Sequence, residues 1–345
     1  MSESLSKYIG WRNWAVFRYN SVFENLFILF FIALIGQRSD WAFLKDSLLF
    51  ILFSIFATTY GYLVNDYSDI ELDRLHGKPN TFKDDSRNKA QLVLLVILFL
   101  AVLTSIPFWD RPYFIVLMLI WFLLTTFYSL PPVRLKERGT ANIVFVVMAQ
   151  RLLPILILFA VFNFWDVQVL ISLLIYVLLR GLASDMNHQL EDYRNDKKTG
   201  TRTFAVSQGY QKVSKWFSVI LQLEKIMLAI ILLQITFNID LNELFTRWLW
   251  IGTGGLYFAG LIWFFLDRRQ WTKNPFDPEE RNLAQFLHHA FPTVALPLAL
   301  NVIAMTIYFP FVILLLFQIF IRRLYSLQIL KNNFMVEFLI QKLRG

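Results

Sequence analysis

The sequence predicts an all-α, polytopic membrane protein with about nine transmembrane helices. Composition is the first observation: 57% of the 345 residues are hydrophobic, 17% are aromatic and 35 are Phe, a balance that soluble domains rarely have. The second is the recurrence of apolar runs near the roughly 20 residues that a helix needs to cross a bilayer. These runs are rich in Phe, Leu and Ile and lack the ten-residue alternation of barrel strands, which favours helices.

Nine apolar runs are the predicted spans, and polar or charged loops separate them. Their boundaries lie near residues 18–36, 43–64, 90–108, 112–130, 140–162, 166–187, 213–237, 246–266 and 285–308.

The last apolar region is longer than one straight crossing, because no charged residue occurs from Gln285 to Ile321. Proline interrupts helices, and Pro310 lies within this stretch. The region is therefore either one broken, tilted helix or a crossing followed by a shorter extra helix. We expect a transmembrane domain over 1–305, then an extra helix and a basic amphipathic tail over 306–345.

Lys and Arg are unevenly divided between the two predicted sides of the membrane. The side of the N-terminus carries 21 of them and the opposite side four. Basic loops stay in the cytoplasm, so we expect this side to face the cytoplasm, as in a bacterial inner (plasma) membrane. The tail carries five further basic residues. With ten crossings they would lie on the cytoplasmic side, as the rule requires, and with nine they would lie on the opposite side.

The net charge of +8 is thus a topology signal, and we expect no nucleic-acid partner because the basic residues cluster in short loops. The chain has no Cys, which excludes disulfides and thiolate metal sites.

Two acidic clusters follow long apolar runs on the predicted cytoplasmic side. The segments that end them share the pattern Asp-x3-Asp-(Arg/Lys)-x2-Gly and then Thr-Phe, beginning at Asp69 and at Asp192, 123 residues later. An offset of about four helices predicts two related four-helix halves around a central cavity, since membrane proteins often bind substrates at a repeat interface. Chance similarity between ordinary loop residues is the alternative.

The acids in each cluster are spaced to share one face of a helix. Asp66, Asp69 and Asp73 follow one another at i, i+3 and i+7, and Asp185, Asp192 and Asp196 at i, i+7 and i+11. Carboxylates are preferred ligands of Mg²⁺, which binds through a few of them together with substrate phosphates. Two facing clusters would hold a diphosphate through Mg²⁺ or Mn²⁺. Solvated loop acids are the alternative.

Basic and aromatic residues near the clusters fit an anionic, lipophilic substrate. Intramembrane charges usually face a cavity or a partner, and Arg151, Arg180 and Lys225 lie inside predicted spans. We expect Arg151 to project toward the phosphates and His188 to position substrate. Candidate phosphate ligands are Arg74, Lys78, Arg134, Lys136, Lys197 and Arg202, and Tyr128 is one of the aromatics that can shield a carbocation.

The combination of motifs resembles the UbiA superfamily of intramembrane prenyltransferases over roughly residues 15–305. The first motif is Asn65-Asp66-x2-Asp69-x3-Asp73-Arg74. The loop after the fourth span reads Tyr128-Ser129-Leu130-Pro131-Pro132-Val133-Arg134-Leu135-Lys136 with Gly139. The second motif is Asp185…Asp192-x3-Asp196…Gly200, and the span count agrees as well.

The resemblance implies nine helices around a cavity in which Mg²⁺ holds a prenyl diphosphate, whose ionisation gives an allylic cation that an acceptor attacks. It assigns the metal–diphosphate set to Asn65, Asp66, Asp69, Asp73, Asp192 and Asp196, and acceptor orientation or deprotonation to Asp185. The chain departs from the family in reading Gly77-Lys78-Pro79-Asn80 where many members carry Arg-Pro, and in having His188 before the second motif.

Three functions therefore remain open. The first is transfer of a polyprenyl group to an aromatic or other lipophilic acceptor. The second is transfer of a phosphoribosyl group to a polyprenyl phosphate. A membrane transporter is the third, although transporter sites usually lie near the bilayer midplane, whereas these acids lie at span ends.

Overall fold

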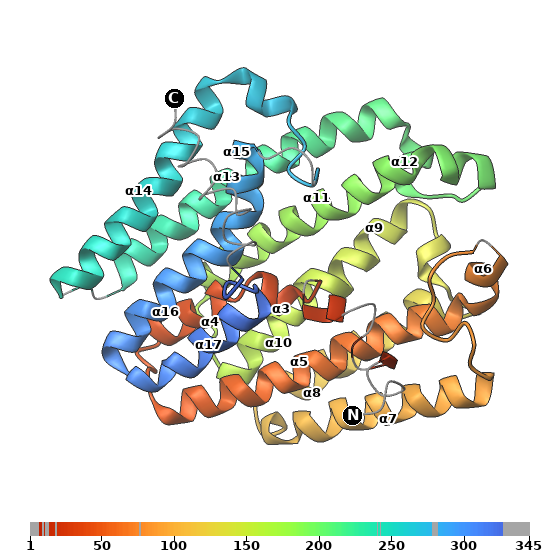
Figure 1. Ribbon diagram of the computed structural model, residues 1–345, viewed down its shortest axis with the longest axis horizontal. Helices are drawn as coiled ribbons and strands as arrows, with labels where there is room; N and C mark the ends of the chain where they lie inside the picture. Colours follow the sequence, from red (N-terminus) through yellow and green to blue (C-terminus); the bar gives the residue numbers. More distant parts are fainter. Residues whose placement is uncertain are drawn as a thin grey trace. The chain divides into compact units, whose positions relative to one another are not determined.

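The computed structural model describes residues 7–8, 10, 14–17, 19–75, 77–239, 241, 243–277 and 282–326. Every regular element in these residues is a helix (Figure 1). Seven helices are long and apolar enough to cross a membrane, and the helices over Phe114–Ser129 and Phe309–Ile321 are shorter and apolar. The predicted all-α membrane fold is confirmed, with fewer full-length spans than nine among the described residues.

The first part of the chain contains α3 (Ser21–Glu24), α4 (Phe27–Ile35), α5 (Trp41–Ser68), α6 (Ile70–Leu75), α7 (Arg87–Ser105), α8 (Phe114–Ser129), α9 (Thr140–Val147) and α10 (Leu153–Phe162). The remainder contains α11 (Val167–Thr199), α12 (Phe204–Gln208), α13 (Tyr210–Asn238), α14 (Leu244–Leu266), α15 (Leu283–Gln285), α16 (Leu296–Ile307) and α17 (Val312–Ile321). Short π-helical segments join α9 to α10 over Met148–Leu152 and α15 to α16 over Phe286–Ala295.

The chain divides into two compact units that differ from the predicted halves. The first unit comprises residues 1–24, 45–165 and 188–210, and the second comprises 25–44, 166–187 and 211–345. Both acidic clusters belong to the first unit, except for residues 185–187 at the start of the second cluster. The related four-helix halves therefore remain a prediction about the repeat, and the compact units follow another division.

The predicted span over 18–36 is two short helices, α3 and α4, rather than one. Asn20 starts α3, because its side-chain oxygen accepts the backbone N–H of Val22 at 2.9 Å. Its side-chain nitrogen donates to the hydroxyls of Ser54 at 2.9 Å and Thr58 at 3.0 Å, which ties α3 to α5. A cap fixed by tertiary contacts therefore sets where α3 begins.

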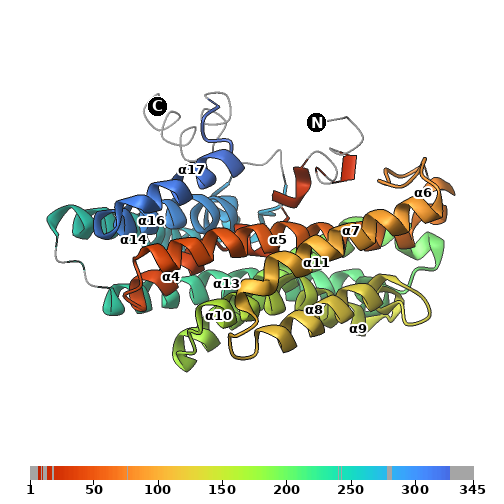
Figure 2. The same cartoon turned by 90° about the horizontal axis from the view of Figure 1, so that it is seen from below.

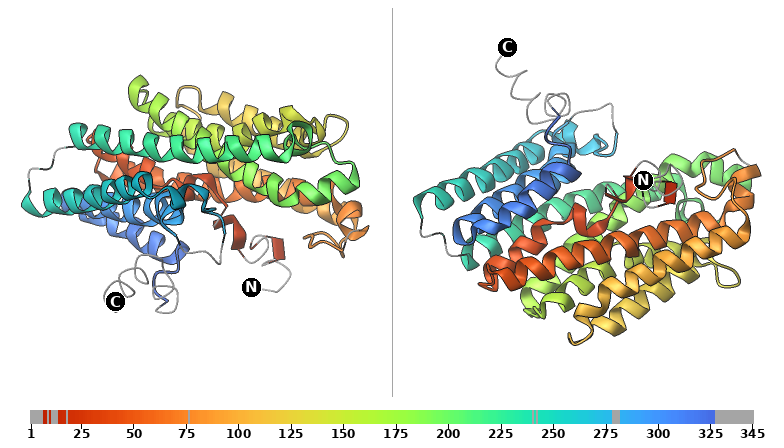
Figure 3. Two further views of the ribbon diagram at one scale, coloured as in Figure 1. Left: turned by 90° about the horizontal axis from the view of Figure 1, so that it is seen from above. Right: turned by 60° about the horizontal axis from the view of Figure 1, so that its bottom comes forward.

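In the first unit, α5 lies beside α7 and α8 (Figure 3). Tyr60 of α5 packs edge-on against Phe122 of α8 with 5.5 Å between ring centroids, and its hydroxyl lies 2.8 Å from that of Thr126. A Cβ added at Gly61 would lie 3.0 Å from Thr125 Cγ2, so a small residue is needed where α5 and α8 approach closely. The tight contact holds the end of α5, and thus the first acidic cluster, in a fixed position.

In the second unit, α4 contacts α16, as Figure 2 also shows. Phe311, which follows α16, lies 6.5 Å from Phe30 of α4 and 6.1 Å from Phe43 of α5 between ring centroids. The chain turns through a 3₁₀ segment containing Pro310 before α17 begins. Of the two alternatives for the charge-free stretch, the structure has a crossing followed by a shorter helix. Residues 327–345 of the predicted tail lie outside the described residues.

The second unit also buries a group of charged side chains. Glu224 accepts from Arg180 at 3.2 Å and contacts the ring of His288, and these side chains are at most 4% exposed. Arg180 also donates to the backbone carbonyl of His288. Arg180 thus links α11 to the π-helical segment Phe286–Ala295 and, through Glu224, to α13.

Candidate functional site

The two acidic clusters end in the same backbone motif. Gly77 and Gly200 both have positive φ, at 65° and 74°. The N–H of Lys78 donates to the carbonyl of Asp73, and the N–H of Thr201 to that of Asp196, each at 2.9 Å. A left-handed glycine with this closing bond is a common helix stop. Equivalent stops 123 residues apart support the repeat seen in the sequence.

Asp66 is fully buried and anchors the loop that follows the first cluster. Its Oδ2 atom accepts the backbone N–H of Thr81 at 3.1 Å and the Thr81 hydroxyl at 2.7 Å. Asn80 donates from its side-chain nitrogen to the Asp66 carbonyl at 2.7 Å and to Asp73 Oδ2 at 2.8 Å. In the second cluster, Gln189 similarly accepts the N–H of Ala205 at 3.0 Å.

Asp69 faces two cations from the loop after α8. Lys136 Nζ lies 2.6 Å from Asp69 Oδ2, and an Arg134 guanidinium nitrogen lies 3.1 Å from Asp69 Oδ1. Lys136 also donates to Asn65 Oδ1 at 3.0 Å, and Ser129 donates to the same atom at 3.1 Å. Burial lowers the pKa of the Lys136 ammonium, and its contact with Asp69 opposes that shift only in part.

The three acids of the first cluster therefore have different partners. Asn65 and Asp69 share Lys136 as a partner, whereas Asp66 turns to Thr81. Asp73 is linked to the Asp66 backbone through Asn80.

In the second cluster, Asp192 is exposed and Asp196 is half-buried. Asp192 and Asp196 stand four residues apart on α11, where like charges repel. The Thr203 side chain lies within hydrogen-bonding range of Asp196, and the Lys78 charge is near enough to act on it. Lys78 belongs to the loop after the first cluster, so the charge of that loop acts on an acid of the second cluster.

Other predicted residues have different surroundings. The Arg74 guanidinium donates to the Lys83 carbonyl at 2.6 Å and thus holds the loop after the first cluster. Arg151 is buried and pairs with Glu24 of α3. The Tyr128 hydroxyl donates to Asn142 Oδ1 at 3.0 Å.

The remaining predicted residues lie at the surface or in the other unit. His188 is exposed, with its Nδ1 atom 3.9 Å from Glu191, and Arg202 is also exposed. Lys197 is exposed at the end of α11. Asp185 is half-buried and belongs to the second unit.

Sequence reasoning missed the polar residues that hold the acids. Asn80 and Thr81 bind the first cluster, and Asn142 donates to the Lys136 carbonyl at 2.8 Å. The only signal for them was the Thr-Phe pair that follows each cluster, because Thr81 and Thr203 both lie beside a cluster aspartate.

The donor set is of the kind that Mg²⁺ binds, although the described residues contain no ready-made group of three or more acidic or His ligands. Asp69 is paired with Lys136 and Arg134, and Asp66 accepts hydrogen bonds from Thr81 of its loop. Asp192 and Asp196 still repel each other, and a cation would relieve that repulsion. Their carboxylate chemistry therefore fits a divalent metal.

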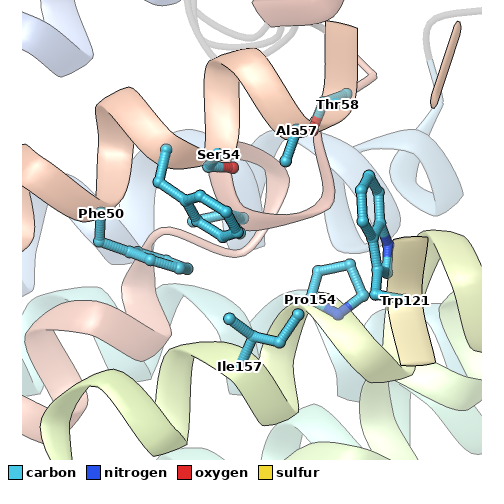
Figure 4. Close-up of a pocket in the computed structure, with 9 residues that line it drawn as sticks. Phe50, Ser54, Ala57, Thr58, Trp121, Pro154 and Ile157 are labelled. Carbon is cyan, nitrogen blue, oxygen red and sulfur yellow. The ribbon is translucent and has the colours of Figure 1, made fainter. Parts of the chain in front are cut away.

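An apolar pocket of the first unit lies between α5, α8 and α10 (Figure 4). Phe50, Trp121, Pro154 and Ile157 line it, with Thr58 among its few polar residues. Thr58 precedes Asn65 by seven residues on α5, which is about 10 Å at 1.5 Å per residue. The polar residues around Asn65 and the apolar pocket therefore lie at successive positions along α5.

Comparisons with known proteins agree with these features. A sequence model of the UbiA prenyltransferase family matches residues 25–288. The digeranylgeranylglyceryl phosphate synthase of Sulfurisphaera tokodaii is 27% identical over 200 residues, which are 56% of this chain and 66% of that relative, just under two thirds.

Solved structures share the fold. A UbiA homologue from Archaeoglobus fulgidus bound to GPP and Mg²⁺ has a TM-score of 0.58 at 16% identity, covering 88% of this chain and 100% of that one. Its complex with DMAPP and Mg²⁺ has a TM-score of 0.57 at 16% identity, covering 87% and 99%. A structure described for digeranylgeranylglyceryl phosphate synthase has a TM-score of 0.54 at 18% identity, covering 88% and 100%.

Proposed function

Because this chain belongs to the UbiA prenyltransferase family, we propose that it transfers a prenyl group from a prenyl diphosphate to a lipophilic acceptor. The observation that carries this proposal is the amphiphilic arrangement in the first unit. The acids and cations around Asn65 and Asp69 suit a diphosphate, and a small pocket about 10 Å along α5 is lined mostly by apolar side chains, the kind that contact a prenyl chain.

We assign the metal and diphosphate to Asn65, Asp69 and Asp73 of the first cluster and to Asp192 and Asp196 of the second. Mg²⁺, when bound, supplies positive charge that offsets the charge developing on the departing pyrophosphate. Asp66 contributes by fixing the loop that carries Asn80, and Asn80 orients Asp73. Asp185 remains our candidate for orienting the acceptor.

Lys136 and Arg134 are the cations best placed for the diphosphate. They contact Asp69 at 2.6 and 3.1 Å. A bound diphosphate would offer both cations oxygen acceptors beside Asp69, which would hold the metal. Arg74, Lys78 and Arg202 remain candidates for secondary contacts, and the Arg151–Glu24 pair favours a structural role for Arg151.

Replacing Lys136 by Met is expected to raise the KM for the prenyl diphosphate about tenfold, because a charge-assisted hydrogen bond contributes roughly 1.5–3 kcal/mol. Steady-state kinetics over a range of prenyl diphosphate concentrations measures the change. Lys215→Met, which removes an exposed ammonium elsewhere, is the matched control. An unchanged KM in Lys136→Met would remove this residue from the diphosphate site.

The acceptor to assay and the orientation of the site follow from one relative and from the charge distribution. One relative is named a digeranylgeranylglyceryl phosphate synthase, so a phosphorylated glyceryl ether is the first acceptor to assay, followed by aromatic acceptors. The excess of Lys and Arg, 21 against four, supports a site on the cytoplasmic side of a bacterial plasma membrane.

Product analysis tests the proposed reaction. Purified protein in detergent receives a labelled prenyl diphosphate, Mg²⁺ and one acceptor at a time, and the lipid product is identified by mass spectrometry. Prenyl transfer gives a product heavier than the acceptor by the prenyl group, together with pyrophosphate. A product only from phosphoribosyl diphosphate and polyprenyl phosphate would indicate phosphoribosyl transfer instead.

A further inference from the structure

The loop after the first acidic cluster is held from outside by the N-terminal segment. Lys7 Nζ and the Tyr8 hydroxyl each lie 2.9 Å from Asp85 Oδ2. Lys89 Nζ lies 2.8 Å from the other carboxylate oxygen of Asp85. The Tyr8 ring stacks on Phe82 with 5.9 Å between centroids, and Phe82 is fully buried.

These contacts persist at neutral pH, because the Asp85 carboxyl is ionised there. Burial by itself raises the pKa of the Asp85 carboxyl, but hydrogen bonds from Lys89, Lys7 and Tyr8 outweigh it and lower that pKa to about 2. The Asp85 side chain is only 5% exposed, so water competes little with its partners. The carboxylate therefore stays ionised and bound across the neutral range.

A short chain of hydrogen bonds connects this contact to the acids of the site. Phe82 donates its backbone N–H to Asn80 Oδ1 at 2.8 Å. The same Asn80 side chain donates to Asp73 Oδ2 at 2.8 Å and to the Asp66 carbonyl. The position of Phe82 therefore fixes the side-chain amide of Asn80, and that amide in turn orients the Asp73 carboxylate.

We propose that Lys7 and Tyr8 form a clamp on residues 79–85 and so position Asp73 for the metal-bound diphosphate. The inference rests on the proposed function of the site. Both clamp residues precede the segment that the family model matches, residues 25–288, so the clamp adds to the matched site from outside it. A loop that is ordered before the ligand arrives loses less conformational entropy on binding, which raises affinity.

The first test compares Asp85→Asn with Asp84→Asn. Asp84 is the exposed neighbour in the same loop, so both variants lose one negative charge at almost the same place. The probe is Mn²⁺ with inorganic pyrophosphate, and the dissociation constant of the ternary complex is measured by electron paramagnetic resonance. We expect Asp85→Asn to bind about five- to tenfold more weakly than wild type, and Asp84→Asn within about twofold, from the usual strength of charged hydrogen bonds.

A second test asks whether restoring the tether restores binding. The chain has no Cys, so Lys7→Cys/Asp85→Cys carries the only two thiols, and a bismaleimide can bridge them. The unbridged double variant is expected to bind manganese pyrophosphate about five- to tenfold more weakly than wild type, and the bridged protein to return to within about twofold of it. A residue that merely stabilises the fold would shift the melting temperature without this recovery.

The outcomes separate the clamp from the proposed function. Wild-type protein that does not bind manganese pyrophosphate overturns the proposed site and the clamp with it. Wild-type binding combined with equal affinities of Asp85→Asn and Asp84→Asn, or with no recovery after bridging, overturns the clamp alone.

Discussion

Replacing Asp69 or Asp192 by Asn is expected to lower prenyl transfer about 100-fold or more while the protein stays folded. Asn keeps the size of the side chain but removes the charge that a divalent metal requires. Each variant removes a carboxylate from a different cluster, so both should fail if both clusters hold one metal-bound diphosphate. Turnover of labelled prenyl diphosphate measures the loss, and thermal unfolding followed by fluorescence of the 11 Trp checks the fold.

Asp66→Asn separates anchoring from metal binding. The buried Asp66 oxygen accepts two hydrogen bonds from Thr81, and an Asn side-chain oxygen can accept the same two. We therefore expect a smaller loss, about tenfold, than for Asp69→Asn, in keeping with one weakened positioning contact. Wild-type turnover in Asp69→Asn and Asp192→Asn would remove those residues from the metal set.

Replacing Glu224 by Ala is expected to lower the free energy of unfolding by about 3–5 kcal/mol, the usual cost of removing one partner from a buried ion pair. Glu224 is 1% exposed and accepts from Arg180 at 3.2 Å, and it also contacts His288. Without Glu224, the guanidinium of Arg180 stays buried and loses its carboxylate. Equilibrium unfolding in mixed micelles, followed by Trp fluorescence, measures the difference.

Glu191→Ala is the control for Glu224→Ala. The Glu191 side chain is 57% exposed, and its contact with His188 spans 3.9 Å, so its loss should change stability by less than about 1 kcal/mol. Equal stability changes in the two variants would contradict the view that the Arg180–Glu224–His288 group supports the second unit.

Hydropathy and length were enough to predict the helices, because a bilayer imposes one requirement on every span. They did not predict where α3 begins. That start depends on Asn20, whose side chain caps α3 and binds Ser54 and Thr58 more than 30 residues away. Local apolarity carries no information about such a tertiary contact.

The repeated spacing in the sequence predicts which acids form the candidate site, but not the partner of each acid. Helical spacing groups Asp66 with Asp69, whereas folding turns Asp66 to Thr81 and Asp69 to Lys136. The partner of each acid depends on how the loop with Thr81 and the loop with Lys136 fold back toward the acids. The spacing of acids along one helix carries no information about those loops.

The sequence also did not reveal the partners of the charged residues within the spans. Glu224 and Lys225 are neighbours in sequence but point in different directions on a helix. Glu224 pairs with Arg180, and Lys225 donates to the Leu221 carbonyl at 2.8 Å. Arg151 likewise pairs with Glu24, which is 127 residues away.

The central claim is that both acidic clusters grip one prenyl diphosphate through a divalent metal. The most direct measurement is pyrophosphate release and lipid product formation from a labelled prenyl diphosphate, first with Mg²⁺, then with excess chelator, then with Mg²⁺ or Mn²⁺ restored. We predict turnover with metal, none in chelator and recovery on restoration. Full turnover in excess chelator, or passage of the substrate across proteoliposomes without chemical change, would contradict the account.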